Sequence, residues 1–127
     1  MSSEYEILIV DDSRFIINLL QQILKLKGFT CKAVESISAA KEELCSHKPK
    51  LIFLDVNLPD SNGFEFCKLL KKKKKFREIL IYFFTGLSEA EVAIKALESK
   101  ADGYLIKPFD LNDLNEIFEH IKHANTA

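Results

Sequence analysis

Five polar side chains in this sequence come directly after runs of large apolar residues. Two carboxylates, Asp11 and Asp12, follow the first of these runs, and a third, Asp55, follows another. Two later runs are followed by Thr85 and Lys107. A charge at the end of a buried strand is costly unless something there interacts with it. We therefore treat these five residues as the candidates for chemistry.

The residue types in this set favour phosphoryl chemistry. Three carboxylates within a few ångströms of one another repel strongly and require a compensating cation. Asp11, Asp12 and Asp55 offer only oxygen ligands, which indicates a hard ion such as Mg²⁺. Lys107 supplies a positive charge and Thr85 a hydroxyl, the groups needed to hold a phosphoryl group. An ionised aspartate is a competent nucleophile toward phosphorus.

The elements that must position these residues alternate between strand and helix. The runs at 7–10, 51–54 and 79–84 are apolar on both faces, which is typical of central strands in a parallel sheet. The shorter runs at 30–34 and 104–106 predict edge strands. We therefore predict an α/β fold: a flavodoxin-like, doubly wound, five-stranded parallel sheet in the order 2-1-3-4-5. The three carboxylates then meet at the crevice between the first and third strands.

Apolar residues at helical spacing predict five helices, one after each strand. The first helix is expected over 13–28, the third from 64 to about 74 and the fourth from 88 to about 100. The second is expected to begin at a cap, Ser36 or Ser38, and to end at Pro49. The fifth is expected to begin after a cap at Asp110. The side chains expected to face the sheet are Ile16, Leu20, Ile23 and Leu24, then Ile37, Ala40 and Leu44, then Phe66, Leu69 and Leu70, and finally Leu111, Leu114, Phe118 and Ile121.

Composition and charge exclude several classes of protein. The 127 residues predict a single domain spanning 1–127, and the net charge of −1 gives no general attraction to nucleic acid or membrane. No apolar run is long enough to cross a bilayer, and the first residues lack the pattern of a signal peptide. Three cysteines without a CxxC pair favour a reducing, cytoplasmic location. The cysteine side chains are expected to be small members of the core.

Over essentially its whole length the chain resembles the receiver domain of two-component response regulators. The resemblance rests on Asp11-Asp12, on Asp55 within Asp-Val-Asn-Leu-Pro-Asp-Ser-Asn-Gly, on Thr85-Gly86, on Tyr104 and on Lys107-Pro108. It implies that Asp55 is the phosphoacceptor. It also implies that Asp11, Asp12 and Asp55 bind Mg²⁺ together with the backbone carbonyl of Asn57.

The same resemblance assigns roles around the phosphoryl group. Lys107, Thr85 and the backbone of Gly86 are expected to bind it. Thr85 and Tyr104 match the switch pair, in which the hydroxyl turns toward the phosphoryl group and the aromatic ring moves inward. The peptide bond before Pro108 is expected to be cis.

Two further positions are expected to set the lifetime of the phosphorylated state. In this family the side chains at Asn57 and Leu87 influence the access of water to the phosphoryl group. Because Leu87 is apolar, we expect it to screen the phosphoryl group and to slow self-dephosphorylation.

The implied function is that of a phosphorylation-dependent signalling switch rather than an enzyme with an external substrate. Asp55 would accept a phosphoryl group from a histidine kinase or a histidine phosphotransfer protein, and the surface of the fourth helix, fifth strand and fifth helix would change. We expect an unidentified downstream protein target, no direct contact with nucleic acid or membrane, and a monomer or a weak phosphorylation-dependent dimer. The chain is either a stand-alone regulator or one part of a longer protein.

Three alternatives belong to other classes. A small phosphohydrolase of the haloacid dehalogenase type would carry a second aspartate two residues after the nucleophile, where this chain has Asn57. An FMN-binding flavodoxin needs a phosphate loop after the first strand, where Asp11 and Asp12 would repel the phosphate. A binding module on the same fold could work without phosphorylation, although the acidic set with Thr85 and Lys107 argues against it.

Two other features could bind ligands. The run Lys71 to Lys75 could bind an anionic surface or nucleic acid, but a solvated helix end is the favoured interpretation because cations suit the helix dipole. His120 and His123 lie one helical turn apart, and without a third ligand they are expected to be solvated residues near the C-terminus.

Overall fold

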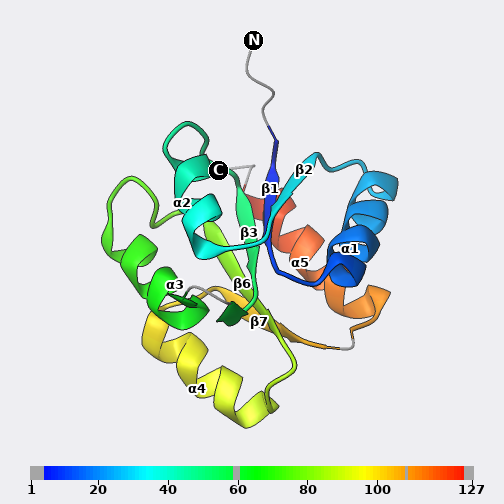
Figure 1. Cartoon of the computed structure of the whole chain (residues 1–127). Coiled ribbons are helices and arrows are strands. Elements are labelled where there is room, and N and C mark those ends of the chain that lie inside the picture. The colour runs from blue at the N-terminus through cyan, green and yellow to red at the C-terminus, as the bar shows by residue number, and fades with distance from the viewer. Residues whose placement is uncertain (1–4, 59–60, 108, 125–127) are drawn as a thin grey trace.

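Five parallel strands form the central sheet of the computed structural model, which describes residues 5–58, 61–107 and 109–124 (Figure 1). These strands are β1 Ile7–Val10, β2 Cys31–Val34, β3 Leu51–Leu54, β6 Leu80–Thr85 and β7 Gly103–Ile106. Their order is β2-β1-β3-β6-β7, and every pair is parallel. The predicted order 2-1-3-4-5 is therefore confirmed.

Five helices cover the two faces of the sheet. They are α1 Arg14–Leu26, α2 Ile37–Leu44, α3 Gly63–Lys72, α4 Glu89–Ser99 and α5 Leu111–Ala124. Helices α1 and α5 pack on one face, whereas α2, α3 and α4 pack on the other (Figure 1). Successive residues of a strand point to opposite faces, so Leu8 joins the core under α2 to α4 and Ile9 joins the core under α1 and α5. This two-sided burial explains why the central strands are apolar throughout.

Serine and aspartate caps fix where the helices begin. The Ser13 Oγ accepts a hydrogen bond from the backbone N–H of Ile16, and the Ser36 Oγ accepts one from Ala39. Of the two predicted caps for α2, Ser36 is therefore the one used. Helix α2 ends at Leu44, well before Pro49, so the prediction that Pro49 terminates it was wrong.

The last helix begins with a reciprocal capping pair. The Asp110 carboxylate accepts from the backbone N–H of Asp113 at 3.0 Å, and the Asp113 carboxylate accepts from the N–H of Asp110 at 3.1 Å. Each carboxylate satisfies a donor that the helix itself leaves unpaired. The predicted cap at Asp110 is confirmed.

Two side chains predicted to face the sheet do not. Leu69 is 41% exposed, and Cys67 is buried beside Phe66 in its place. Leu111 is 53% exposed because it is the first residue of α5, and Ile117 completes the buried stripe instead. In both helices some apolar residues lie outside the face that is buried against the sheet. Hydropathy alone therefore predicted too wide a buried face.

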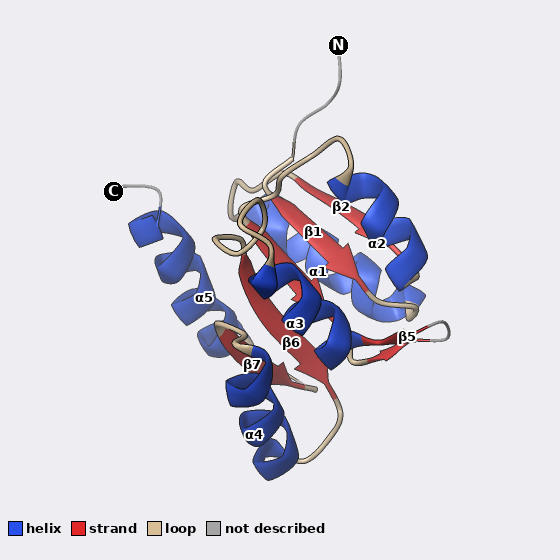
Figure 2. Ribbon diagram, turned by 90° about the vertical axis from the view of Figure 1, so that its left-hand side faces the viewer, coloured by secondary structure: helices blue, strands red, loops and turns tan. Residues whose placement is uncertain are grey.

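A short antiparallel ladder, which was not predicted, follows the third strand of the sheet. It joins β4 Asn57–Leu58 to β5 Ser61–Asn62 and lies beside the start of α3 (Figure 2). Leu58 is carried into the core, and the Asn62 Oδ1 accepts from the N–H of Phe64 at 2.8 Å. The segment was predicted as a turn because it is rich in Pro, Asn and Gly. Pro59 and Asp60 lie outside the described residues.

The lysine run that begins at Lys71 is not simply a solvated helix end. The Lys71 side chain is 8% exposed, and its ammonium donates to the carbonyls of Arg77 and Ile79. It also lies 2.7 Å from the Asp102 carboxylate, which in turn accepts from the N–H of Ile81. Lys71 therefore stabilises the loop between α3 and β6 by binding it to Asp102 beside the edge strand β7. Lys72 to Lys75 are exposed.

Two further predictions about single side chains were wrong. His120 is half-buried, and its Nδ1 hydrogen-bonds the Tyr82 hydroxyl, whereas His123 is exposed as expected. Burial raises the pKa of Tyr82 to about 12, so the phenol stays neutral.

The cysteines were predicted to be core side chains, and this holds for Cys67, which is buried. Cys45 is exposed and does not belong to the core. No helix in the described ranges is both long and apolar enough to span a membrane.

Candidate functional site

Three carboxylates converge at the carboxyl ends of β1 and β3. These two strand ends lie at the lower edge of the sheet in Figure 1. The two strands are neighbours in parallel register, with Val10 opposite Leu54. Asp11 and Asp55, each the next residue, therefore leave the sheet side by side. One oxygen from each of Asp11, Asp12 and Asp55 lies within 4.8 Å of the other two. The predicted convergence of these three residues is present.

Asp11 is held by two hydrogen bonds. It is 1% exposed, and one carboxylate oxygen accepts from the backbone N–H of Ser13 at 2.8 Å. The other oxygen accepts from the Lys107 ammonium at 3.0 Å. A buried carboxylate needs this kind of compensation, since its desolvation is otherwise too costly. Asp12, in contrast, is exposed to solvent.

Lys107 links the carboxylates across the sheet. Its ammonium lies 3.8 Å from Asp55 as well as 3.0 Å from Asp11. The Lys107 backbone N–H donates to the Thr85 carbonyl at 2.8 Å, and the ammonium lies 5.0 Å from the centre of the Phe84 ring. Backbone pairing and a cation–π contact thus fix the lysine from two sides. The lysine was predicted from the sequence, but the supporting ring of Phe84 was not.

The donor set fits a hard divalent cation. All three acidic side chains present oxygen, and a single ammonium cannot neutralise three carboxylates. Asp12 faces solvent, where a partly hydrated ion such as Mg²⁺ could be bound. Asp11, Asp12 and Asp55 are the residues that would hold it. The Asn57 backbone belongs to β4, two residues after Asp55.

Gly63 sets the path of the chain beside Asp55, and sequence analysis did not identify this role. A Cβ on Gly63 would lie 2.5 Å from the Asp55 carbonyl oxygen and 2.8 Å from the Val56 Cα. The Gly63 N–H donates to the Val56 carbonyl at 3.1 Å. Only a residue without a side chain permits this approach of the start of α3 to the backbone of Asp55. The sequence signal that could have indicated this role is the position of the glycine at the end of a turn-rich segment.

Thr85 ends β6 and is buried, with 1% of its surface exposed. Its Oγ1 accepts from the backbone N–H of Leu87 at 3.1 Å. Leu87 is half-buried and packs against the core under α2 to α4. Gly86 is exposed, and a Cβ there would meet nothing within 4 Å. The hydroxyl is thus held locally in the turn that leads to α4.

Tyr104 lies on the strand next to Thr85. It is opposite Phe83 in the β6–β7 register, is half-buried, and packs against the core under α2 to α4. Its ring is therefore neither fully inside nor fully outside the domain. The predicted cis peptide bond concerns Pro108, which lies outside the described residues.

Comparison with known protein families agrees with this geometry. Residues 7–119 match the model of the response regulator receiver domain family. The phosphate regulon transcriptional regulatory protein PhoB of Klebsiella pneumoniae is 35% identical over 108 residues, which are 85% of this chain and 47% of that protein. The alkaline phosphatase synthesis transcriptional regulatory protein PhoP of Bacillus subtilis is 36% identical over 110 residues, or 87% of this chain and 45% of that protein. The chain spans about half the length of these curated relatives.

Solved structures match nearly the whole chain. A two-component response regulator from Clostridium difficile has a TM-score of 0.86 and 28% identity, with 98% of this chain and 100% of that chain covered. A CheY-like response regulator receiver domain from Methanospirillum hungatei has a TM-score of 0.85 and 26% identity, with 98% of each chain covered. The similarity in fold thus extends over 98% of this chain in both structures.

Proposed function

Because this chain belongs to the response regulator receiver domain family, we propose that it is a phosphorylation-dependent switch in which Asp55 accepts a phosphoryl group. The observation that carries the proposal is the pairing of one ammonium with two carboxylates: Lys107 lies 3.0 Å from Asp11 and 3.8 Å from Asp55. Asp11 is held by two donors, and Asp55 lies at the same edge within reach of the Lys107 ammonium.

The proposed reaction is phosphoryl transfer from a phosphohistidine. An oxygen of Asp55 attacks phosphorus, the P–O bond forms, and the P–N bond breaks as the imidazole nitrogen takes the electron pair. The donor is a histidine kinase or a histidine phosphotransfer protein. Lys107 is close enough to follow the new negative charge, which favours the phosphorylated product.

A Mg²⁺ ion held by Asp11, Asp12, Asp55 and the Asn57 carbonyl would neutralise charge on the transferring oxygens. Asp11 contributes by its rigidity, because Ser13 and Lys107 fix both of its oxygens. Asp12 contributes from the solvent side, where it is exposed and can adjust.

The proposed response to phosphorylation begins at Thr85. A phosphoryl group on Asp55 would accept a hydrogen bond from the Thr85 hydroxyl, whose oxygen in this structure accepts from the Leu87 N–H, and would draw Thr85 toward Asp55. Movement of Thr85 vacates space that the half-buried ring of Tyr104 can fill. Gly86, next to Thr85, can bring its backbone N–H to the phosphoryl oxygens.

The surface of α4, β7 and α5 would report the change to a partner. Ile94 and Leu97 on α4 and Leu111 on α5 are large apolar residues with exposed side chains. Ile94 and Leu97 lie one turn apart on α4, and exposed apolar residues gathered on one helix are a feature of interaction sites. The partner is a downstream protein, and phosphorylation could also favour a weak dimer of an otherwise monomeric chain. We propose no direct contact with nucleic acid or membrane.

Hydrolysis of the aspartyl phosphate would reset the switch. Leu87 and Asn57 are the side chains proposed to control how fast water reaches the phosphoryl group. The chain thus catalyses only its own phosphorylation and dephosphorylation, as one cytoplasmic domain spanning 1–127.

The Mg²⁺ requirement provides the experiment. Incubation with acetyl phosphate and Mg²⁺ is expected to give a phosphoprotein, and excess chelator is expected to prevent it. If no phosphoprotein forms with Mg²⁺, the proposed function is wrong. Equal phosphorylation in chelator would contradict the metal role alone.

A further inference from the structure

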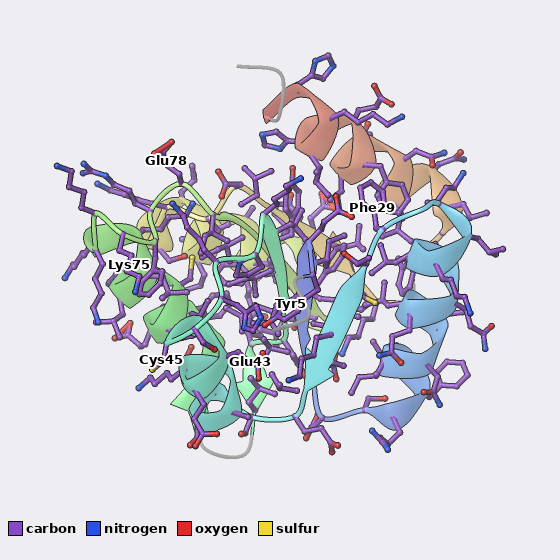
Figure 3. All side chains as sticks on the ribbon, turned by 90° about the horizontal axis from the view of Figure 1, so that it is seen from above. Tyr5, Phe29, Glu43, Cys45, Lys75 and Glu78 are labelled. Atoms are coloured by element: carbon purple, nitrogen blue, oxygen red, sulfur yellow. The ribbon has the colours of Figure 1, made fainter. Side chains whose placement is uncertain are left out.

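A second concave surface lies between the ends of α2 and α3, on elements that do not carry the proposed phosphorylation site. It has a volume of about 460 Å³, within the range of ligand-binding clefts. Cys45 follows α2 and Lys75 follows α3, and Figure 3 shows both on the same side of the molecule. We propose that this groove binds an acidic, amphipathic segment of a partner protein.

The floor of the groove is apolar. Leu44 of α2 and Phe66 and Leu70 of α3 are buried at its base. Leu69, which points away from the sheet, and the half-buried Phe76 extend the apolar surface outward. The exposure of Leu69 is therefore accounted for by its place in the groove. Such a floor can accept one or two large apolar side chains of a partner.

The rim of the groove is cationic. Lys41 approaches from α2, and Lys73 and Lys75 approach from the end of α3 and the following loop. All three are exposed, and none of the described residues that line the groove is acidic. Two of the exposed lysines of the run, Lys73 and Lys75, thus border an apolar surface. Carboxylates on a partner would complement this rim.

The groove is formed before any partner binds, because backbone bonds hold the loop that closes it. The N–H groups of Phe76 and Arg77 donate to the Lys73 carbonyl at 3.0 and 2.9 Å. The buried Lys71 ammonium donates to the carbonyls of Arg77 and Ile79. A partner would therefore not have to order this loop, which favours binding.

The combination of floor and rim selects one class of occupant. A membrane surface takes up apolar side chains that protrude, whereas the floor here is concave. A nucleic acid backbone would match the lysines but leave the apolar floor exposed to water. A protein segment with apolar residues on one face and carboxylates beside them satisfies both parts. This binding does not depend on phosphorylation of Asp55.

A defined probe tests the proposal with the whole chain. The probe is a synthetic helical peptide with Leu and Phe on one face and Glu on the other, and its twin has Lys in place of Glu. Amide chemical shifts of residues 41–45 and 69–76 are expected to move with the acidic peptide and not with its twin. The exposed thiol of Cys45 gives a second readout, since the acidic peptide is expected to slow its alkylation.

A pair of charge reversals supplies the matched control. The double variant Lys73→Glu/Lys75→Glu is expected to weaken binding of the acidic peptide by about tenfold or more, since like charges then meet at the rim. Lys25→Glu/Lys27→Glu, also at the end of a helix, is expected to change affinity less than about twofold, because Lys25 and Lys27 lie outside the groove.

Three results would overturn the proposal. They are an acidic peptide that moves no groove amide, a basic twin that binds equally well, and binding to phosphatidylserine-containing vesicles that the same two lysines control while the acidic peptide does not bind.

Discussion

The ammonium of Lys107 lies 3.0 Å from the carboxylate of Asp11, a residue 96 positions earlier in the chain. This contact joins the first and last strands of the chain across the carboxyl edge of the sheet. The same ammonium lies 3.8 Å from Asp55, so one lysine compensates two of the three clustered carboxylates. The charge balance of the site therefore depends on Lys107.

Removal of that ammonium is expected to separate metal binding from phosphorylation. In Lys107→Met the three carboxylates lose a competing cation, so Mg²⁺ should bind about as tightly as in the wild type or more tightly. The rate of phosphorylation by acetyl phosphate should nevertheless fall, because the product loses its positive partner. Mg²⁺ titration monitored by thermal unfolding, together with phosphorylation kinetics, measures both. Weaker Mg²⁺ binding in the variant would contradict this charge balance.

The two neighbouring aspartates are expected to respond differently to neutralisation. Asp11→Asn should lower the free energy of unfolding by about 2 kcal/mol, because the buried side chain loses its charge-assisted hydrogen bonds from Lys107 and Ser13, while weaker repulsion within the carboxylate cluster offsets part of the loss. Asp12→Asn should change it by less than about 0.5 kcal/mol, because Asp12 is exposed. Urea unfolding without Mg²⁺ measures the difference, and the stabilisation by added Mg²⁺ should decrease in both variants. Equal destabilisation without the metal would show that burial does not distinguish the two residues.

A methyl group at position 63 is expected to disturb the backbone of Asp55. Gly63→Ala places a Cβ 2.5 Å from the Asp55 carbonyl oxygen, and overpacking of this kind costs about 1–3 kcal/mol of stability. Gly86→Ala is the matched control, since a Cβ there meets nothing within 4 Å. Denaturant unfolding of the two variants should therefore differ clearly. A neutral Gly63→Ala would mean that the start of α3 shifts without cost.

Acid is expected to weaken the contact between Glu43 and the start of the chain. The Lys32 ammonium and the Tyr5 hydroxyl donate to Glu43 at 2.8 and 2.6 Å, and these bonds, that of Lys32 first, lower the pKa of the carboxyl (Figure 3). A carboxyl with a lowered pKa when folded stabilises the fold above its unfolded pKa of about 4.3 and loses this contribution as the pH falls further.

Comparison with Glu43→Gln isolates that contribution. The wild type should be more stable than the variant at pH 7, and the difference should shrink as the pH falls below about 4.3. Urea unfolding at several pH values gives the measurement. A difference that stays constant with pH would show that the charge of Glu43 does not stabilise the fold.

The sheet was predictable because its central strands are buried on both faces, and such strands are apolar at every position. The same reasoning placed Asp11, Asp55, Thr85 and Lys107 at one edge, since parallel strands end together. What escaped prediction depends on contacts between distant segments. The buried Lys71 is one case, because its partner Asp102 lies 31 residues away. The pair of Tyr82 and His120, 38 residues apart, is another.

Short strands and the limits of the buried helix faces could not be predicted from the sequence either. The β4–β5 ladder has two residues on each side, too few for a period to appear in the sequence. The close approach of Gly63 to the Asp55 backbone depends on how α3 packs beside β3, which no hydropathy pattern encodes. Leu69 was assigned to the core on hydropathy, whereas its position beyond the buried stripe leaves it in the groove between α2 and α3.

The most direct test of the account is to locate the phosphoryl group itself. After reaction with acetyl phosphate and Mg²⁺, the acyl phosphate can be trapped by reduction and assigned by mass spectrometry of peptides. We predict modification of Asp55 alone, and none in Asp55→Asn, with Asp60→Asn as a control that keeps full labelling. Modification of another residue in the wild type, or undiminished labelling of Asp55→Asn, would contradict the central claim.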